Sequence, residues 1–294
     1  MEKILITGLG MVGYELINKL SNNYEIHVLN RSNKEFFNNY NNIYKYPIDI
    51  TNKNKLNNII NKINPDVIIN TAAYTHVDNC EIDKKIAYNV NALSVEHLGK
   101  IAKSLNIPLH HISTDYVFNG EKGNYLETDE INPINYYGYT KAQGEKLLLN
   151  LNYDNVSIIR ISTPYGISPV KVNFFMWVLN SLKNNEKVNI VNNQFNTSTY
   201  ILELCEYIKL MIEKEIYGIY HIGSANKLSR YEFALKIQKI FNLNEDLIHP
   251  VSSASMNWKA KRPMDTSLNS KKIENKLNKK LKTVDECLEE LKKM

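Results

Sequence analysis

Three features of this 294-residue sequence predict an α/β fold, in which helices cover both faces of a parallel sheet. Short runs rich in β-branched residues alternate with longer runs whose apolar residues recur at helical spacing. The short runs are apolar on both faces, as is typical of strands in a buried parallel sheet. A glycine-rich turn separates the first short run from the first helical run. The length allows one large domain or two unequal ones.

The regular alternation occupies residues 1–165, which we expect to form the first domain. The expected strands are Lys3–Thr7, Glu25–Leu29, Asp66–Asn70, Leu109–Ser113 and Ser157–Ile161. The expected helices are Met11–Leu20, Lys53–Ile63, Ala87–Leu105 and Tyr136–Asn150. Connections between neighbouring parallel strands are right-handed in nearly all proteins, so the order of these segments predicts a doubly wound sheet.

Residues 166–294 are expected to form a smaller α/β lobe, because the alternation loosens after Gly166. Some of its strands and helices are expected to cross back to the first domain. The expected helices are Asn173–Asn184, Tyr200–Glu213 and Arg230–Phe241, and the expected strands are Lys187–Val191 and Gly218–Ile222.

Composition argues against several classes of partner. The net charge of +5 includes a lysine cluster in Lys271–Lys282, which we interpret as solvated surface because no aromatic residues are interleaved for base stacking. We therefore expect no nucleic-acid partner. No apolar run approaches the about 20 residues needed to span a bilayer, so we expect no membrane association.

The cysteines and histidines give no pattern of metal ligands. Cys80, Cys205 and Cys287 are widely spaced, which predicts a reducing, cytoplasmic location. The seven histidines include no H-E-x-x-H spacing, so no metal site is predicted. We interpret His110 and His111, which lie in an expected strand, as structural.

The glycine-rich turn has the spacing of a phosphate-binding loop, since Gly8, Gly10 and Gly13 follow the first strand and open the first helix. Gly8 permits the tight turn, Gly10 lets a pyrophosphate approach the backbone, and Gly13 lets the helix pack against the strand. Met11 and Val12 place free N–H groups at the helix N-terminus. This context predicts a Rossmann-type dinucleotide site.

The end of the second strand bears on which dinucleotide binds. NAD-selective sites usually place an acidic residue here, and this chain has Asn30 and Arg31 instead. Arg31 can pair with a 2′-phosphate, which favours NADP(H) as cofactor and leaves NAD(H) as the alternative.

A tyrosine and a lysine lie one helical turn apart near the start of an expected helix. Tyr137 and Lys141 share a face because they are four residues apart. A neighbouring ammonium favours the phenolate of tyrosine, whose ordinary pKa is near 10, and brings proton transfer within reach of neutral pH. Thr114 follows Ser113 at the carboxyl end of an expected strand, where doubly wound sheets place their ligands. The Thr114 hydroxyl is suited to hold a substrate carbonyl.

These motifs, in this order, resemble the extended short-chain dehydrogenase/reductase superfamily, and within it the dTDP-4-dehydrorhamnose reductases. The resemblance spans nearly the whole chain and includes Asn70–Asp78, Gln194-Phe195 and Lys261–Pro263. It implies further cofactor contacts, which are Asp49, Ile50, Ala72, Ala73, Tyr74, Asn91 and Ser113. It also implies substrate contacts, which are Thr75, Val77, Asp115, Tyr116, Thr163, Asn173, Gln194 and Arg262.

The resemblance implies hydride transfer from NADPH to C4 of a 4-keto-6-deoxy hexose carried on a nucleoside diphosphate. The expected substrate is dTDP-4-dehydro-L-rhamnose and the product dTDP-L-rhamnose. In this scheme Tyr137 protonates the alkoxide, Lys141 lowers the pKa of Tyr137 and holds the nicotinamide ribose, and Thr114 orients the carbonyl. Homodimers are common among such proteins, and we leave that state open.

Three departures from the family pattern keep alternatives open. The glycine loop is one residue shorter than usual. Thr163 stands where a tryptophan is common, and the segment after Gln194-Phe195 lacks the usual glycine and proline. The last two departures fall on the substrate side. The chain is therefore compatible with a reductase or epimerase of another nucleotide sugar, and also with a non-catalytic regulatory subunit.

Overall fold

The computed structural model describes residues 1–31 and 36–294, and these residues divide into two compact units. Unit 1 contains Met1–Ser113, Asn135–Ile159 and Cys205–Ile219, and unit 2 contains Thr114–Ile134, Arg160–Leu204 and Tyr220–Met294. The expected boundary at residue 165 is simpler than this division. The chain enters unit 2 already at Thr114, and the later segment Cys205–Ile219 returns to unit 1.

The largest sheet, most of which belongs to unit 1, confirms the predicted doubly wound architecture. Among the described residues, its seven strands follow the order β3-β2-β1-β4-β5-β6-β9. The pairs β1–β2, β1–β4, β2–β3 and β4–β5 are parallel. The strands are β1 (Lys3–Thr7), β2 (Glu25–Asn30), β3 (Ile43–Pro47), β4 (Val67–Asn70), β5 (Leu109–Thr114), β6 (Val156–Ile161) and β9 (Gly218–Ile222). The order reverses between β1 and β4, which is where such sheets bind dinucleotides.

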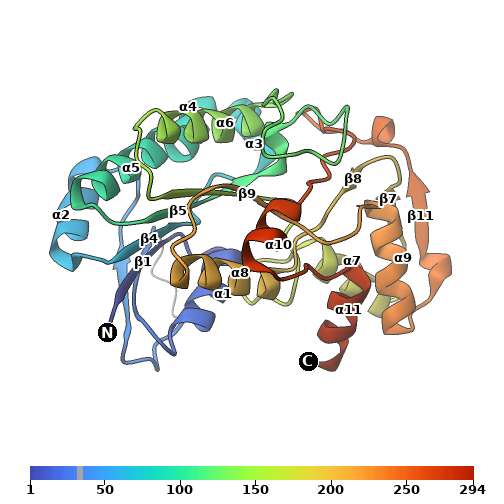
Figure 1. Cartoon of the computed structure of the whole chain (residues 1–294). Helices are drawn as coiled ribbons and strands as arrows, with labels where there is room; N and C mark the ends of the chain where they lie inside the picture. Colours follow the sequence, from blue (N-terminus) through green and yellow to red (C-terminus); the bar gives the residue numbers. More distant parts are fainter. Residues whose placement is uncertain (32–35) are drawn as a thin grey trace. The chain divides into compact units, whose positions relative to one another are not determined.

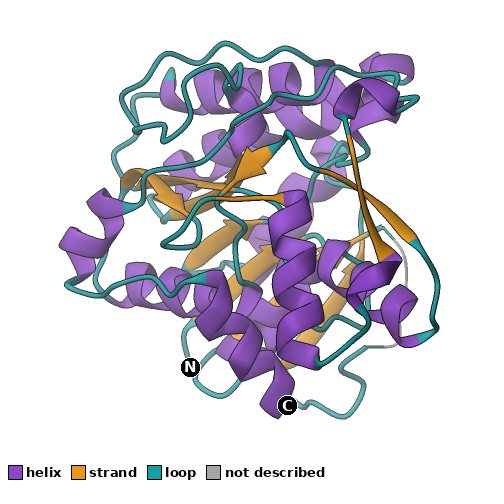
Figure 2. Ribbon diagram, turned by 90° about the vertical axis from the view of Figure 1, so that its right-hand side faces the viewer, coloured by secondary structure: helices purple, strands orange, loops and turns teal. Residues whose placement is uncertain are grey.

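Helices cover both faces of this sheet. Figure 1 shows α5 and α6 on one face and α1 and α8 on the other, and the same layering is visible in Figure 2. The bounds are α1 (Met11–Leu20), α2 (Lys53–Ile63), α3 (Val77–Ile82), α4 (Lys84–Tyr88), α5 (Ser94–Leu105), α6 (Tyr136–Leu149) and α8 (Ile201–Glu213). A π-helical turn, Asn89–Leu93, joins α4 to α5, so the single helix expected over this stretch is three successive segments. Apolar side chains of β1, β4 and β5 pack against α2 and α5 in the core.

Asparagine ends several helices where glycine would be usual. Asn64, Asn106, Asn242 and Asn278 follow α2, α5, α9 and α10 in the left-handed conformation. Asparagine tolerates this conformation better than other residues that carry a side chain. The asparagine richness therefore helps to set the helix ends, in a chain with only 11 glycines.

Unit 2 has its own apolar core and two small sheets. β7 (Val188–Val191) pairs in parallel with β11 (Ile248–Val251), and β8 (Phe195–Asn196) pairs antiparallel with β10 (Leu228–Ser229). Its helices include α7 (Phe174–Lys183), α9 (Arg230–Phe241), α10 (Lys271–Leu277) and α11 (Val284–Lys293). Buried residues of α7, α9, α11, β7 and β11 form one cluster. Across residues 1–31 and 36–294, no helix has both the length and the apolar character needed to cross a membrane.

Candidate active site

A groove of about 220 Å³ in unit 1 lies over the glycine turn and the ends of β1, β2 and β4. Ten of its lining residues are among those that the sequence predicts for the site: Gly8, Gly10, Asn30, Arg31, Asp49, Ile50, Ala72, Ala73, Tyr74 and Thr75. Nine of these were expected to contact cofactor, and Thr75 was expected to contact substrate. The apolar lining had no such motif and was missed: Leu9, Leu29, Ile48 and Val90, together with Thr71.

The glycine turn fits a dinucleotide phosphate. Gly8 has a φ of +85°, and an added Cβ would lie 2.7 Å from the Ala72 Cα. An added Cβ at Gly13 would lie 2.1 Å from the Gly8 carbonyl oxygen, whereas one at Gly10 would meet nothing within 4 Å. Gly10 is also the N-cap of α1 and has no side chain to occupy the first N–H groups. The turn therefore combines a tightly packed backbone with an open approach to a helix N-terminus, which suits an anion.

Two side chains that line this groove, Asp49 and Arg31, differ in their contacts. Asp49 Oδ1 accepts hydrogen bonds from the Thr51 backbone N–H at 2.9 Å and from Thr51 Oγ1 at 2.7 Å. Asp49 thus shapes the turn that leads into α2. Arg31 is exposed at the end of β2, which leaves its guanidinium accessible to an anionic ligand.

Asn91 ties the loop after β4 to α6. Its Oδ1 accepts from the Tyr74 backbone N–H at 2.8 Å, and its Nδ2 donates to the Tyr74 carbonyl at 3.1 Å and to Thr140 Oγ1 at 3.0 Å. Tyr74 is further held by its hydroxyl, which donates to Asp83 at 2.7 Å. Asn91 lies in the π-helical turn and is fully buried, so it orders the groove lining. Loop and helix α6 are therefore positioned together.

Tyr137 and Lys141 lie on α6, as expected. The helix begins after Asn135, whose side chain caps the Gly138 N–H at 2.8 Å. Tyr137 is half-buried, and the Lys141 side chain is 1% exposed. Lys141 Nζ donates to the Ile112 carbonyl at 2.7 Å. Burial lowers the pKa of Lys141 to about 8, although the nearby Glu145 carboxylate raises it.

Ser113 has a partner that the sequence did not reveal. Its hydroxyl donates to Glu145 of α6, and both side chains are buried. This bond links the end of β5 to the helix that carries Tyr137 and Lys141. The signal in the sequence was a Gly144-Glu145 pair one turn after Lys141. An added Cβ at Gly144 would lie 2.2 Å from the Asn91 carbonyl oxygen, so glycine allows the close approach.

The residues that follow Ser113 belong to unit 2, where Asp115 is the centre of a hydroxyl cluster. Asp115 Oδ1 accepts from Thr114 Oγ1 at 3.0 Å, and Oδ2 accepts from Ser162 Oγ at 2.7 Å and from Thr266 Oγ1. Burial raises the pKa of Asp115, and the three hydroxyls oppose that change. Tyr116 donates its backbone N–H to Thr114 Oγ1 at 3.2 Å, and burial raises the pKa of its phenol. Asp115 thus holds Thr114, the residue expected to orient the carbonyl.

Two of the departures from the family pattern contact each other in unit 2. Thr163 has a φ of +36°, which is unusual for a β-branched residue. Asn196 is buried and donates its Nδ2 to Thr163 Oγ1 at 3.0 Å. Gln194, two residues earlier, is 6% exposed, and its Nε2 has no hydrogen-bond partner among the described residues. An unpaired buried amide is a group that a polar ligand would satisfy.

The other expected substrate residues have structural contacts. Asn173 caps α7 by accepting the Met176 N–H at 3.2 Å, and its Nδ2 donates to the Gly166 carbonyl at 2.7 Å. The Arg262 guanidinium lies 5.2 Å from the centre of the Trp258 ring. In unit 1, Val77 is half-buried at the first position of α3.

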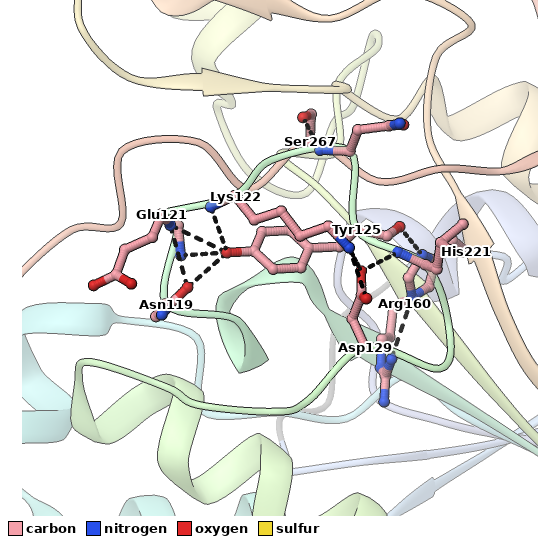
Figure 3. Close-up of polar contacts among 11 residues, drawn as sticks. Asn119, Glu121, Lys122, Tyr125, Asp129, Arg160, His221 and Ser267 are labelled. Carbon is pink, nitrogen blue, oxygen red and sulfur yellow. Dashed lines mark hydrogen bonds and ion pairs between the residues drawn. The ribbon is translucent and has the colours of Figure 1, made fainter.

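The loop that follows Phe118 is held by one tyrosine, as Figure 3 shows. The Tyr125 hydroxyl accepts the backbone N–H groups of residues 120–122 at 3.0–3.2 Å and donates to Asn119 Oδ1 at 2.6 Å. The Tyr125 carbonyl lies 3.0 Å from His221 Nδ1, and the buried Arg160 lies 3.2 Å from His221 Nε2. Burial, followed by the charge of Arg160, lowers the pKa of His221 to about 3. A neutral His221 therefore joins the loop to Arg160.

Over the described ranges 1–31 and 36–294, no group of three or more His, Cys, Asp or Glu side chains is placed to hold a metal ion. Cys80, Cys205 and Cys287 are buried and unbridged. Unit 1 contains the groove and the Tyr137–Lys141 pair, and unit 2 contains Thr114, which is held by Asp115.

Comparison with known proteins is consistent with this chemistry. A curated dTDP-4-dehydrorhamnose reductase from Aggregatibacter actinomycetemcomitans is 36% identical over 290 residues, with 93% of this chain and 92% of that protein covered. The spore coat polysaccharide biosynthesis protein SpsK from Bacillus subtilis is 32% identical, with 93% and 91% covered.

Solved structures show the same fold over nearly the whole chain. A hypothetical dTDP-4-dehydrorhamnose reductase from Sulfolobus tokodaii is 37% identical, with a TM-score of 0.86 and coverage of 96% and 97%. The Bacillus anthracis dTDP-4-dehydrorhamnose reductase, solved in complex with NADP, is 29% identical, with a TM-score of 0.85 and coverage of 99% and 98%. The family described as the RmlD substrate binding domain matches residues 1–293. The chain therefore belongs to this family, within the extended short-chain dehydrogenases/reductases.

Proposed function

We propose that this protein uses NADPH to reduce the 4-keto group of a nucleotide-linked 4-keto-6-deoxy sugar, with dTDP-4-dehydro-L-rhamnose as substrate and dTDP-L-rhamnose as product. The observation that carries the proposal is the presence of Tyr137 and Lys141 in the same unit as the dinucleotide groove, on a helix that Asn91 ties to the groove lining. Family membership and the names of the relatives support the same reaction.

Three residues of the chain would have separate roles in the reaction. The bound nicotinamide supplies the hydride. Tyr137 donates a proton to the developing alkoxide oxygen, and Lys141 stabilises the phenolate that remains. The Thr114 hydroxyl has one hydrogen, which it donates to Asp115 at 3.0 Å, so it would turn that hydrogen to the carbonyl oxygen when substrate binds and orient the carbonyl in that way.

Comparing Tyr137→Phe with Tyr139→Phe tests the role of Tyr137. Tyr139 lies on the same helix and is 42% exposed, so its substitution is a matched control. We expect Tyr137→Phe to bind NADP⁺ normally and to lose turnover, measured from the decrease in NADPH absorbance. Tyr139→Phe is expected to keep both. Substantial turnover by Tyr137→Phe would contradict the proposal.

For the cofactor, NADP(H) is favoured because Arg31 is exposed at the edge of the groove, and because Asn30 and Arg31 stand at the end of β2, where an NAD-selective site usually has an acidic residue. NAD(H) is the alternative. The relative from Bacillus anthracis was solved with NADP. Measuring kcat/KM with NADPH and with NADH compares the two directly.

A second candidate is the reduction or epimerisation of another nucleotide sugar, favoured by the Thr163–Asn196 contact on the substrate side. A panel of nucleotide sugars, each tested for NADPH oxidation and for thermal stabilisation with NADP⁺, separates the two candidates. A selective ligand raises the unfolding temperature by mass action.

We also propose a cytoplasmic location and no nucleic-acid partner. The homodimer stays a candidate oligomeric state, which sedimentation of the full chain would test. A binding-only regulatory subunit would not need Tyr137, Lys141 and Thr114 together, and stoichiometric capture of an enzyme partner would revive that alternative.

A further inference from the structure

Four buried side chains form a continuous hydrogen-bonded chain through unit 1. Thr7 of β1, Asn70 of β4, His111 of β5 and Lys141 of α6 are each at most 1% exposed. Thr7 Oγ1 lies 2.6 Å from Asn70 Oδ1, Asn70 Nδ2 lies 3.0 Å from His111 Nδ1, and His111 Nε2 lies 3.2 Å from Lys141 Nζ. Each of these contacts needs one donor and one acceptor, so the protons in the chain cannot be arranged freely.

A backbone amide fixes the direction of the first links. The Ala72 N–H lies 3.2 Å from Asn70 Oδ1, and a backbone N–H can only donate. The oxygen of the Asn70 amide must therefore face Ala72 and Thr7, and its NH₂ group must face His111. Since that NH₂ group also donates, His111 Nδ1 has to accept and cannot carry a proton.

The remaining proton of His111 then lies on the far side of the ring. Burial, followed by the charge of Lys141, lowers the pKa of His111 well below 6.5, so the ring is neutral and has a single N–H. With Nδ1 accepting, that N–H is Nε2–H, and it faces Lys141 Nζ. An ammonium has only donors, so it would bring two N–H groups into opposition, whereas a neutral amine has a lone pair that accepts.

We propose that Asn70 holds His111 in its Nε2–H tautomer, and that this N–H faces Lys141 and lowers the proton affinity of that lysine. His111 and Asn70 are therefore positioning residues for Lys141. The hydrogen-bond argument stands independently, and its catalytic consequence rests on the proposed reductase function. The second contact of Lys141 Nζ, with the Ile112 carbonyl, suits either form because both forms donate.

The other groups that face Lys141 also affect how readily it holds its proton. On α6, the Glu145 carboxylate favours the ammonium, and Tyr137 precedes Lys141 by one turn. On β5, His111 is the titratable group in contact with the amine. Burial outweighs Glu145, since the pKa of Lys141 is lowered to about 8. With a midpoint near pH 8, Lys141 is mostly an ammonium at pH 7, as stabilisation of the Tyr137 phenolate requires, and it loses its proton at a lower pH than an exposed lysine does.

Reversing one hydrogen bond tests this proposal. Asn70→Asp keeps an oxygen facing Ala72 and Thr7 but replaces the donor facing His111 with an acceptor. We expect His111 to change to the Nδ1–H tautomer, which turns a lone pair toward Lys141. Thr7→Val is the control, because it removes a neighbouring bond without changing the direction of the chain.

The readout is NMR on the full chain with ¹⁵N-labelled histidine and ¹³Cε-labelled lysine, with signals assigned by His111→Gln and Lys141→Met. The expected wild-type result is the Nε2–H tautomer and a Lys141 midpoint near pH 8. Asn70→Asp should switch the tautomer and raise the proton affinity of Lys141 at least tenfold, while Thr7→Val should leave the tautomer unchanged.

A wild-type His111 that carries its proton on Nδ1, or on both nitrogens at pH 7, would overturn the proposal. So would an Asn70→Asp variant that keeps the Nε2–H tautomer. The wild-type measurement needs no variant, so it remains decisive even where a substitution prevents folding. It also needs no substrate. Failure to reduce any nucleotide sugar would therefore refute the proposed function and leave the tautomer result intact.

Discussion

Replacing Gly13 and Gly10 in turn by alanine separates the packing role of the glycine turn from its binding role. At Gly13 the new Cβ would lie 2.1 Å from the Gly8 carbonyl oxygen and 2.9 Å from Thr71 Oγ1, so the turn must shift. Such overpacking costs about 1–3 kcal/mol, and alanine's better helix propensity returns up to about 1 kcal/mol. We therefore expect a loss of roughly 1–2 kcal/mol in the free energy of unfolding, which lowers Tm by roughly 2–8 °C.

Gly10→Ala is the matched control, because its Cβ would meet nothing within 4 Å. Its unfolding temperature should stay within about 2 °C of wild type, since a helix N-cap tolerates alanine at a modest cost. Its affinity for NADP⁺ should fall, because the added methyl group occupies the approach of the pyrophosphate. Thermal unfolding followed by circular dichroism and NADP⁺ titration by calorimetry measure the two effects. A wild-type Tm for Gly13→Ala, or wild-type NADP⁺ affinity for Gly10→Ala, would refute this reasoning.

Three further predictions concern buried titratable groups and the cofactor. Lys141→Met should raise the free energy of unfolding near pH 7 by up to about 3 kcal/mol. The lowered pKa of Lys141 means that the folded state resists the ammonium, so this gain should shrink as urea unfolding is repeated from about pH 8 toward 10.5. His110 is fully buried with a pKa lowered to about 4, so it contributes a loss of stability as pH drops from 6.5 toward 4. His110→Leu should remove that share of the loss, while His111 and His221, whose pKa values are also lowered by burial, keep theirs. Equal acid sensitivity of the two proteins would contradict this prediction. Arg31→Asp should shift the ratio of kcat/KM for NADPH over NADH by roughly tenfold toward NADH, and an unchanged ratio would show that Arg31 makes no contact with a 2′-phosphate.

Local patterns in the sequence were enough to predict most of unit 1. Strand β1 and helices α1 and α2 have the expected bounds because β-branched runs and amphipathic spacing are local properties. In unit 2, β8 and β10 have two residues each, which is too short for any periodicity. Helix α11 was not predicted, although the sequence has the pattern of a capping box at its start, formed by Thr283 and Glu286.

The candidate site, too, could be predicted from the sequence only where its residues form short local motifs. The glycine turn and the Tyr137–Lys141 pair are short motifs and were readable as such. The bonds that orient them join distant residues, as in the 41 positions between Asn70 and His111 or the 151 between Asp115 and Thr266. No spacing rule links such residues, because their meeting depends on strand order and on side-chain direction.

Two departures from the family pattern, Thr163 and the segment after Gln194-Phe195, contact each other in the structure and are best explained together. Thr163 and Asn196 are 33 positions apart, yet the Asn196 amide donates to the Thr163 hydroxyl at 3.0 Å. A non-glycine residue with positive φ costs of order 1–3 kcal/mol, and Thr163 adopts this conformation in a segment where Ser162 is fixed by Asp115. Asn196 is buried, so its amide needs a hydrogen-bond partner, whereas Thr163 is half-buried. The Thr163 hydroxyl supplies that partner, so each departure makes sense only with the other, and substrate preference should follow the pair rather than either residue alone.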